Sequence, residues 1–396
     1  MMRAGLLLLL MGSAALSQAQ RLEVNGDWKA MPSQTAIPFL LEEPMSQAYL
    51  HQRTNLKWRS ANRAWSVRLE ARTRVFYGSQ VEQTAGFADG LSADAGVWDG
   101  SWNWWEAADE KGVGNTLIDR ALVSYRRNRL RVDLGRQRIN WGRHTVWNPN
   151  DLFNAYNFFD FDYAERPGTD ALRVRYGVGD NGMNEVEVAA RPGTPDRAPL
   201  VAGLFRWNVR SVDGQILSAY LENTYAVGGA VSAGWGPLSL KAEGTHFGAS
   251  PTWGDSAIGS GTVGIDATWG EGAFAQVAVL RTPGLGGSAL LGLASAGQTT
   301  QQPWSLLPFA RTLMTQLTLP ATERLRVSGA LLFVPEEDVL IAMPSVVFDA
   351  APNLTASLVV QHARIRSPFI PDAPMETLTT AAFLSLQWNF RVRNLL

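Results

Sequence analysis

Residues 65–76 read Trp-Ser-Val-Arg-Leu-Glu-Ala-Arg-Thr-Arg-Val-Phe, and this alternation decides the fold class. Apolar side chains stand at positions 65, 67, 69, 71 and 75, whereas polar or charged side chains stand at 66, 68, 70, 72 and 74. Successive side chains of a β-strand point to opposite faces, so a strand here has one apolar and one charged face. A strand that crosses a membrane needs about 9–11 residues of this pattern. The segment therefore predicts a transmembrane β-strand.

The same alternation returns along most of the chain. Ordinary strands average about 5–6 residues, so long alternating segments repeated over the chain favour an all-β, transmembrane antiparallel β-barrel over a soluble sandwich. The candidate strands are 49–58, 65–76, 116–126, 129–137, 170–177, 184–191, 200–209, 215–224, 225–235, 238–247, 261–269, 273–281, 309–319, 324–334, 339–349, 353–364 and 378–392.

The connections between these segments alternate in length. Long ones include 78–115, 138–169 and 282–308, and short ones include 127–128, 179–182, 211–214 and 270–272. Bacterial barrels place short turns on the periplasmic side and long loops outside. With the sides fixed in this way, we expect about 16 strands in the wall. Segment 49–58 is then one strand too many for a closed barrel. If a further strand within 20–44 pairs with it, the barrel has 18 strands, which is the alternative.

The start of the chain resembles an export signal. Arg3 precedes an apolar run at 6–11, and Ser17 and Ala19 supply the small residues of a cleavage site. We therefore predict a signal peptide over 1–19 with cleavage after Ala19. Residues 20–47 are expected to form a periplasmic lead-in, a plug or a first strand, and the barrel is expected to take 48–396. The chain has no cysteine, which excludes a lipid-modified N-terminal cysteine and any disulfide.

Composition limits the partners. The 35 Lys and Arg residues balance 36 Asp and Glu residues, which argues against nucleic acid as a partner. The expected partners of a barrel in an outer membrane are membrane lipid and lipopolysaccharide, small hydrophilic solutes and the barrel-assembly machinery. The sequence does not decide whether the chain forms a homo-oligomer. No Gly-rich phosphate loop or nucleotide fingerprint occurs, and no cofactor is expected.

The charged faces of the strands are rich in arginine. One interpretation is a charged pore wall, in which rows of arginine favour anions. The other is a ladder of ion pairs that neutralises itself and stabilises the wall. Clustering of arginine on the early strands tilts the expectation toward anions. The predicted pore-lining residues are Arg68, Glu70, Arg72, Arg74, Arg131, Asp133, Arg173, Arg175, Arg324 and Arg326.

The long connection 138–169 is dense in aromatic, Asn and Asp residues. A segment this apolar is expected to fold into the barrel mouth and narrow the lumen, where aromatic faces beside amide and carboxylate groups suit sugar or aromatic solutes. The alternative is a structural plug with Asn and Asp in turns. The predicted constriction residues are Trp141, Arg143, His144, Trp147, Asn150, Asp151, Tyr156, Asp160 and Asp162.

Catalysis and metal binding find little support in the sequence. No Gly-x-Ser-x-Gly elbow is present, and His144 is the one histidine in the special segment, so we expect no enzyme. The Asn and Asp oxygens at 148–162 are of the kind that calcium takes, but no Asp-x-Asp-x-Asp-Gly loop occurs, so no metal site is predicted.

A short motif closes segment 129–137 and opens the long loop. The run Gly135, Arg136, Gln137, Trp141 and Gly142 resembles a motif of uncharacterised porin-like outer-membrane proteins of Gram-negative bacteria. The resemblance implies an outer-membrane location and a barrel fold and adds little about the solute. Together with the charged wall and the aromatic loop, it favours an outer-membrane channel for passive or weakly selective diffusion of small hydrophilic solutes. The alternatives are a non-conducting barrel for surface, polysaccharide or lipid assembly, and an outer-membrane hydrolase.

Overall fold

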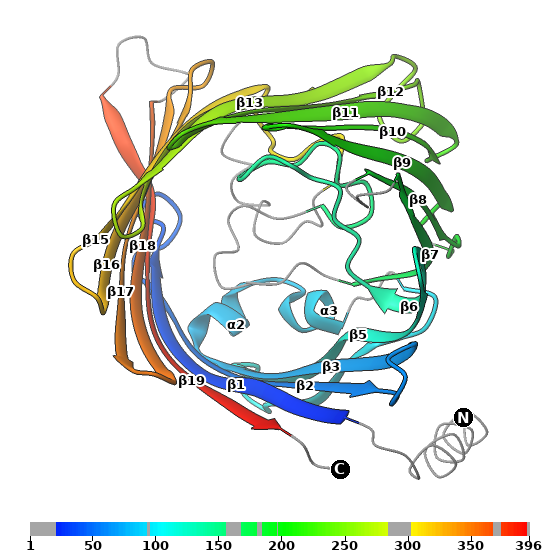
Figure 1. The fold of residues 1–396 in the computed structure, drawn as a ribbon. Coiled ribbons are helices and arrows are strands. Elements are labelled where there is room, and N and C mark those ends of the chain that lie inside the picture. The colour runs from blue at the N-terminus through cyan, green and yellow to red at the C-terminus, as the bar shows by residue number, and fades with distance from the viewer. Residues whose placement is uncertain are drawn as a thin grey trace.

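A computed structural model describes residues 21–92, 96–155, 168–179, 184–195, 197–283, 302–366 and 374–393. This part of the chain forms one closed antiparallel barrel (Figure 1). Nineteen strands pair in a single sheet, and 18 of them make the wall because β4 pairs only with the first part of β5. The predicted signal peptide, 1–19, lies outside the described residues.

The strand bounds follow the alternating segments closely. The strands are β1 (Arg21–Ala36), β2 (Met45–Arg59), β3 (Trp65–Tyr77), β4 (Ser101–Glu106), β5 (Gly112–Arg127), β6 (Leu130–Gln137), β7 (Thr169–Val178), β8 (Asn184–Arg191), β9 (Leu200–Val209), β10 (Val212–Leu221), β11 (Thr224–Trp235), β12 (Leu238–Phe247), β13 (Ile258–Trp269), β14 (Ala273–Arg281), β15 (Arg311–Pro320), β16 (Leu325–Val334), β17 (Val339–Ala351), β18 (Leu354–Arg366) and β19 (Met375–Arg393).

The first strand closes the barrel. β1 pairs with β2 on one side and with β19 on the other, so that Trp28 stands opposite Trp388. The count of 18 is therefore the alternative that the sequence left open, and β1 and β2 are the two strands that the expectation of 16 left out. Pro32 lies where the pairing between β1 and β19 lapses, between Ala30 and Ser33. A proline, which has no backbone N–H, is tolerated at such a gap.

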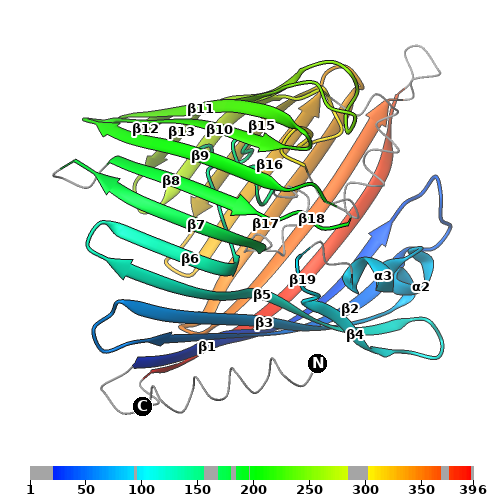
Figure 2. The same cartoon turned by 90° about the vertical axis from the view of Figure 1, so that its right-hand side faces the viewer.

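The connection after β3 is more structured than the sequence indicated. It contains two short helices, α2 (Ser79–Gln83) and α3 (Phe87–Ser92), and then β4. Figure 2 shows these elements together at one end of the barrel. No helix in the described ranges is both long and apolar enough to cross a membrane.

The two faces of the wall differ as the alternation predicts. Trp65, Val67 and Leu69 of β3 are exposed on the outer surface, whereas Glu70 and Arg72 are buried inside. Exposed Val, Leu, Ile and Trp side chains recur on the outer face of most strands. This band is the surface that a β-barrel presents to lipid.

The two ends of the barrel also differ. At one end the connections are short, such as 128–129, 210–211 and 236–237, and backbone φ is positive at Asn128, Arg210 and Gly236, as tight hairpins require. Residues 180–183 of one predicted turn lie outside the described residues. The long connections stand at the other end, and the ends of β1 and β19 nearest the termini lie at the short-turn end (Figure 2).

Candidate functional site: the lumen and its inserted segment

The end of β6 directs the chain into the barrel. Gly135 has a φ of 116°, and a Cβ there would overlap the backbone oxygen of Ala121. Arg136 donates to both carboxylate oxygens of Asp170, at 3.1 and 3.0 Å, and its guanidinium stands 4.2 Å from the ring centre of Trp98. Gly135 and Arg136, from the motif described in the sequence, therefore fix the end of β6. The inserted segment, residues 138–155, begins directly after it.

Trp141 anchors the inserted segment to the wall. Its side chain is fully buried, and its indole N–H donates to Glu187 of β8 at 2.6 Å. Glu187 also accepts two hydrogen bonds from Arg173 of β7, at 2.6 and 2.8 Å. Phe153 meets the indole edge to face at 5.3 Å. The carboxylate of Glu187 thus joins Trp141, a predicted constriction residue, to Arg173, a predicted pore-lining residue. The alternation placed Glu187 on the lumen-facing side, but the predicted pore-lining set did not include it.

Glu243 of β12 holds the next part of the segment. Its Oε2 accepts the backbone N–H groups of Arg143 at 2.6 Å and His144 at 2.9 Å, and its Oε1 accepts that of Asn150 at 2.8 Å. Thr245, on the same face of β12, donates to the backbone oxygen of Pro149 at 2.9 Å. Three backbone donors on one buried carboxylate make a strong, directional anchor.

The far part of the segment packs on the opposite strands. Val146 and Trp147 join a buried apolar cluster with Leu280 of β14, Met314 of β15 and Leu332 of β16. The segment therefore starts at β6, is pinned to β8 and β12, and reaches β14–β16. Figure 1 shows it inside the ring of strands, where it narrows the lumen.

The buried part of the predicted arginine face is largely paired. Asp133 is 2% exposed and accepts from Arg131 at 3.0 Å and from Arg175 at 2.8 Å. Arg72 lies 3.8 Å from Asp119, and Arg74 donates to the side chain of Asn115 at 2.6 Å. Along this stretch the cross-strand ladder of ion pairs describes the wall better than a row of unneutralised arginines does.

The short-turn end of the same wall is different. Arg68 and Arg131 keep 41% and 37% of their side chains exposed, although each has an acidic neighbour. They line a cavity of about 350 Å³ with further cations from β2, β5 and the turn after β2. These additional cations, which the predicted set omitted, are Lys57, Arg59, Arg63 and Arg126.

Arg324 and Arg326 stand away from this cavity. Arg324 is exposed in the turn before β16, and Arg326 is 55% exposed and lies 3.5 Å from Asp349. The structure places both at the rim of the short-turn end, across the barrel from the arginine-rich strands β2, β3 and β5–β7.

The wall opposite the arginines is neutral and polar. A cavity of about 580 Å³ lies between the inserted segment and strands β14–β19. Thr145 and Lys29 border it, and hydroxyl and amide side chains cover much of the wall. The latter include Gln276, Gln316, Ser328, Ser345, Ser357, Ser385 and Gln387. A solute inside the barrel would thus meet a cationic surface and a hydrogen-bonding surface.

Five constriction candidates are buried and serve the packing of the segment rather than facing the lumen, namely Trp141, His144, Trp147, Asn150 and Asp151. Asp151 is 1% exposed, so it does not present its charge to water. His144 is buried, its Nδ1 accepts the backbone N–H of Val146 at 3.2 Å, and burial, with Lys241 nearby, lowers its pKa to about 4. The candidates Tyr156, Asp160 and Asp162 lie outside the described residues. Among the residues that are described, no three His, Asp or Glu side chains converge on a shared metal position.

Comparison with known proteins gives a fold and no family. No family model matches the chain, and no curated protein matches its sequence. Solved structures do match in shape. OccAB1 of Acinetobacter baumannii superposes with a TM-score of 0.57 at 10% identity over 95% of this chain and 97% of that chain. OccK3 of Pseudomonas aeruginosa gives 0.57 at 7% identity over 97% and 99%. The chain therefore has the fold of Gram-negative outer-membrane porins.

Proposed function

We propose that this chain is an outer-membrane channel through which small hydrophilic solutes diffuse passively, with a preference for anions. Barrels of 16–18 strands are wide enough to leave an aqueous channel. The observation that carries the proposal is that polar cavities stay open beside the inserted segment, which Glu187 and Glu243 anchor to β8 and β12.

The preference for anions rests on where the arginines are exposed. Deep in the wall, carboxylates such as Asp133 pair with buried arginines such as Arg175. At the short-turn mouth six cationic side chains line one cavity, and Arg68 and Arg131 keep large exposed surfaces there. A cluster of one sign within a pore raises the local concentration of the opposite ion.

A second candidate function is a barrel that binds a ligand without conducting. The observation in its favour is the amount of buried apolar surface that the inserted segment forms with the wall, in clusters that include Trp147 and Trp141. A closed plug of this kind would leave the cavities as separate binding pockets.

Selectivity measurements test the preferred function. In a planar bilayer under a salt gradient, the purified protein is expected to conduct with a reversal potential that favours anions. Arg68→Gln combined with Arg131→Gln should move that potential toward the cation side. Arg127→Gln, a matched change at the outer face of the same rim, should leave it unchanged. A folded protein without conductance would favour the non-conducting barrel. An unchanged reversal potential in the double variant would contradict the claim that the cationic mouth sets the preference for anions.

A further inference from the structure

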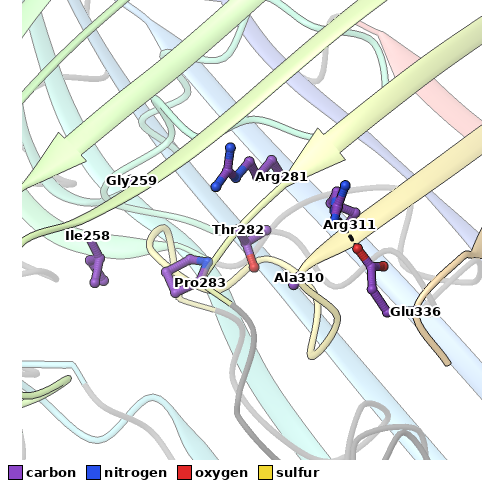
Figure 3. A pocket seen from close by; sticks show the side chains of 8 residues that line it. All are labelled: Ile258, Gly259, Arg281, Thr282, Pro283, Ala310, Arg311 and Glu336. Atoms are coloured by element: carbon purple, nitrogen blue, oxygen red, sulfur yellow. Dashed lines mark ion pairs between the residues drawn. The ribbon is translucent and has the colours of Figure 1, made fainter.

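Two arginines stand together on the outer face of the barrel at its long-loop end. Arg281 ends β14, Arg311 begins β15, and the two are direct cross-strand partners. Both are exposed and share the face of Val279 and Leu313, which belong to the exposed apolar band. Figure 3 shows them on neighbouring strands, with Glu336 paired to Arg311.

The arginines border a cavity of about 530 Å³. Its lining also includes Ile258, Thr282 and Pro283. Glu336 neutralises one of the two cations, and no carboxylate in the described ranges pairs with Arg281. The cavity therefore keeps an excess of one positive charge. It offers two guanidinium groups, which bind the oxygens of phosphate with well-matched geometry.

An apolar groove lies below the cavity on the same outer face. It has a volume of about 630 Å³ and crosses β13–β17. Its lining includes Val277, four residues from Arg281 along β14, and Leu317, six residues from Arg311 along β15. At about 3.4 Å per residue, Val277 lies roughly 14 Å from Arg281. The groove is open because Gly329 contributes no side chain, and a Cβ there would meet no atom within 4 Å.

We propose that this face binds a phosphorylated, acylated lipid of the outer leaflet. The phosphate would lie between Arg281 and Arg311, and an acyl chain would lie in the groove beside Gly329. Long loops mark the outer side of a bacterial barrel, so a headgroup at this rim belongs to the outer leaflet. The inference rests on the outer-membrane location contained in the proposed function but not on conduction.

Binding of a defined lipid to the mature protein in neutral detergent tests the proposal. The probe is a bis-phosphorylated, acylated glucosamine disaccharide, compared with its dephosphorylated form and with inorganic phosphate, and bound lipid is counted by native mass spectrometry. Each arginine near an anionic headgroup contributes about fivefold in affinity. Arg281→Gln with Arg311→Gln should therefore weaken binding of the phosphorylated lipid by about 25-fold. Arg127→Gln, an outward arginine at the opposite rim, should leave it unchanged.

Further variants separate the headgroup from the acyl chain. Arg281→Lys with Arg311→Lys keeps the charge and should give intermediate binding. Gly329→Trp should fill the groove and weaken lipid binding several-fold, while heat-modifiable migration on a gel confirms a folded barrel. Unchanged lipid binding by the folded double Gln variant would overturn the proposal. Binding of inorganic phosphate as tight as that of the lipid, or equal binding of the dephosphorylated form, would also overturn it.

Discussion

Replacement of Glu243 by Gln should release the middle of the inserted segment without unfolding the barrel. The carboxylate accepts three backbone N–H groups, from Arg143, His144 and Asn150. A hydrogen bond to a charged acceptor contributes about 1.5–3 kcal/mol, against about 0.5–1.5 kcal/mol for a neutral one. The amide of Gln keeps one neutral carbonyl acceptor and turns an NH₂ group toward the remaining donors.

The expected cost is about 2–4 kcal/mol for docking of residues 143–150, from one bond lost and the others weakened. Since 1.4 kcal/mol is a factor of ten, the released state should gain a factor of about 30–1,000 in population. Hydrogen exchange followed by mass spectrometry measures the population of the released state directly, because the three exchanging amides are the groups that donate to Glu243. Their exchange should accelerate by about the same factor, and single-channel conductance should become larger or noisier.

A matched control separates release from loss of charge. Glu70→Gln removes another buried lumen carboxylate, which pairs with Arg53 at 2.9 Å; among the described residues no hydrogen bond joins it to the inserted segment. Exchange at 143–150 should stay slow in this variant, whatever happens to ion selectivity. A folded Glu243→Gln protein whose amides at 143–150 exchange as slowly as in the parent would refute the reasoning.

Four other predictions can be tested separately, three from the structure and one from the sequence. Leu69→Arg should cost about 2–4 kcal/mol of folding free energy if Leu69 lies near the bilayer midplane, whereas Arg68→Gln should fold normally; equal urea stability of the two would contradict the assigned faces. Replacing 141–164 by a short Gly/Ser linker should leave the barrel folded and raise conductance. The pKa of His144 in the folded protein, about 4, lies below its ordinary value of 6.5. The folding free energy should therefore be intact above pH 6.5 and fall by up to about 3 kcal/mol as the pH drops toward 4. Thermal unfolding measured across this pH range should show the loss, and His144→Gln should flatten the profile. N-terminal sequencing of the outer-membrane protein should begin at Gln20, and a start at Met1 would contradict the predicted cleavage.

The wall could be predicted from the sequence wherever one face meets lipid. On β3 the alternation of Leu69 with Arg68 follows from the two-residue period of a strand, and a shift of one residue would bury charge in lipid. β1 was harder to recognise, because Pro32, Pro38 and Pro44 made 20–44 look irregular. Pro32 is accommodated where the ladder to β19 lapses, a gap that depends on the far end of the chain.

The inserted segment could be predicted in part. Its aromatic density indicated burial inside the barrel, but its anchors are distant in sequence: Glu187 is 46 residues from Trp141, and Glu243 is 100 residues from Arg143. The sequence also could not show which arginines pair with carboxylates and which keep an exposed charge. The pairing depends on cross-strand register, which sets Arg175 of β7 beside Asp133 of β6. Lys57 and Arg59 were missed because β2 was not counted in the wall.

Single-channel recording of the mature protein in a planar bilayer under a salt gradient tests the central claim most directly. We expect discrete openings with a reversal potential that favours anions, and a larger conductance when 141–164 is replaced by the short linker. The absence of conductance in both folded forms would contradict the account.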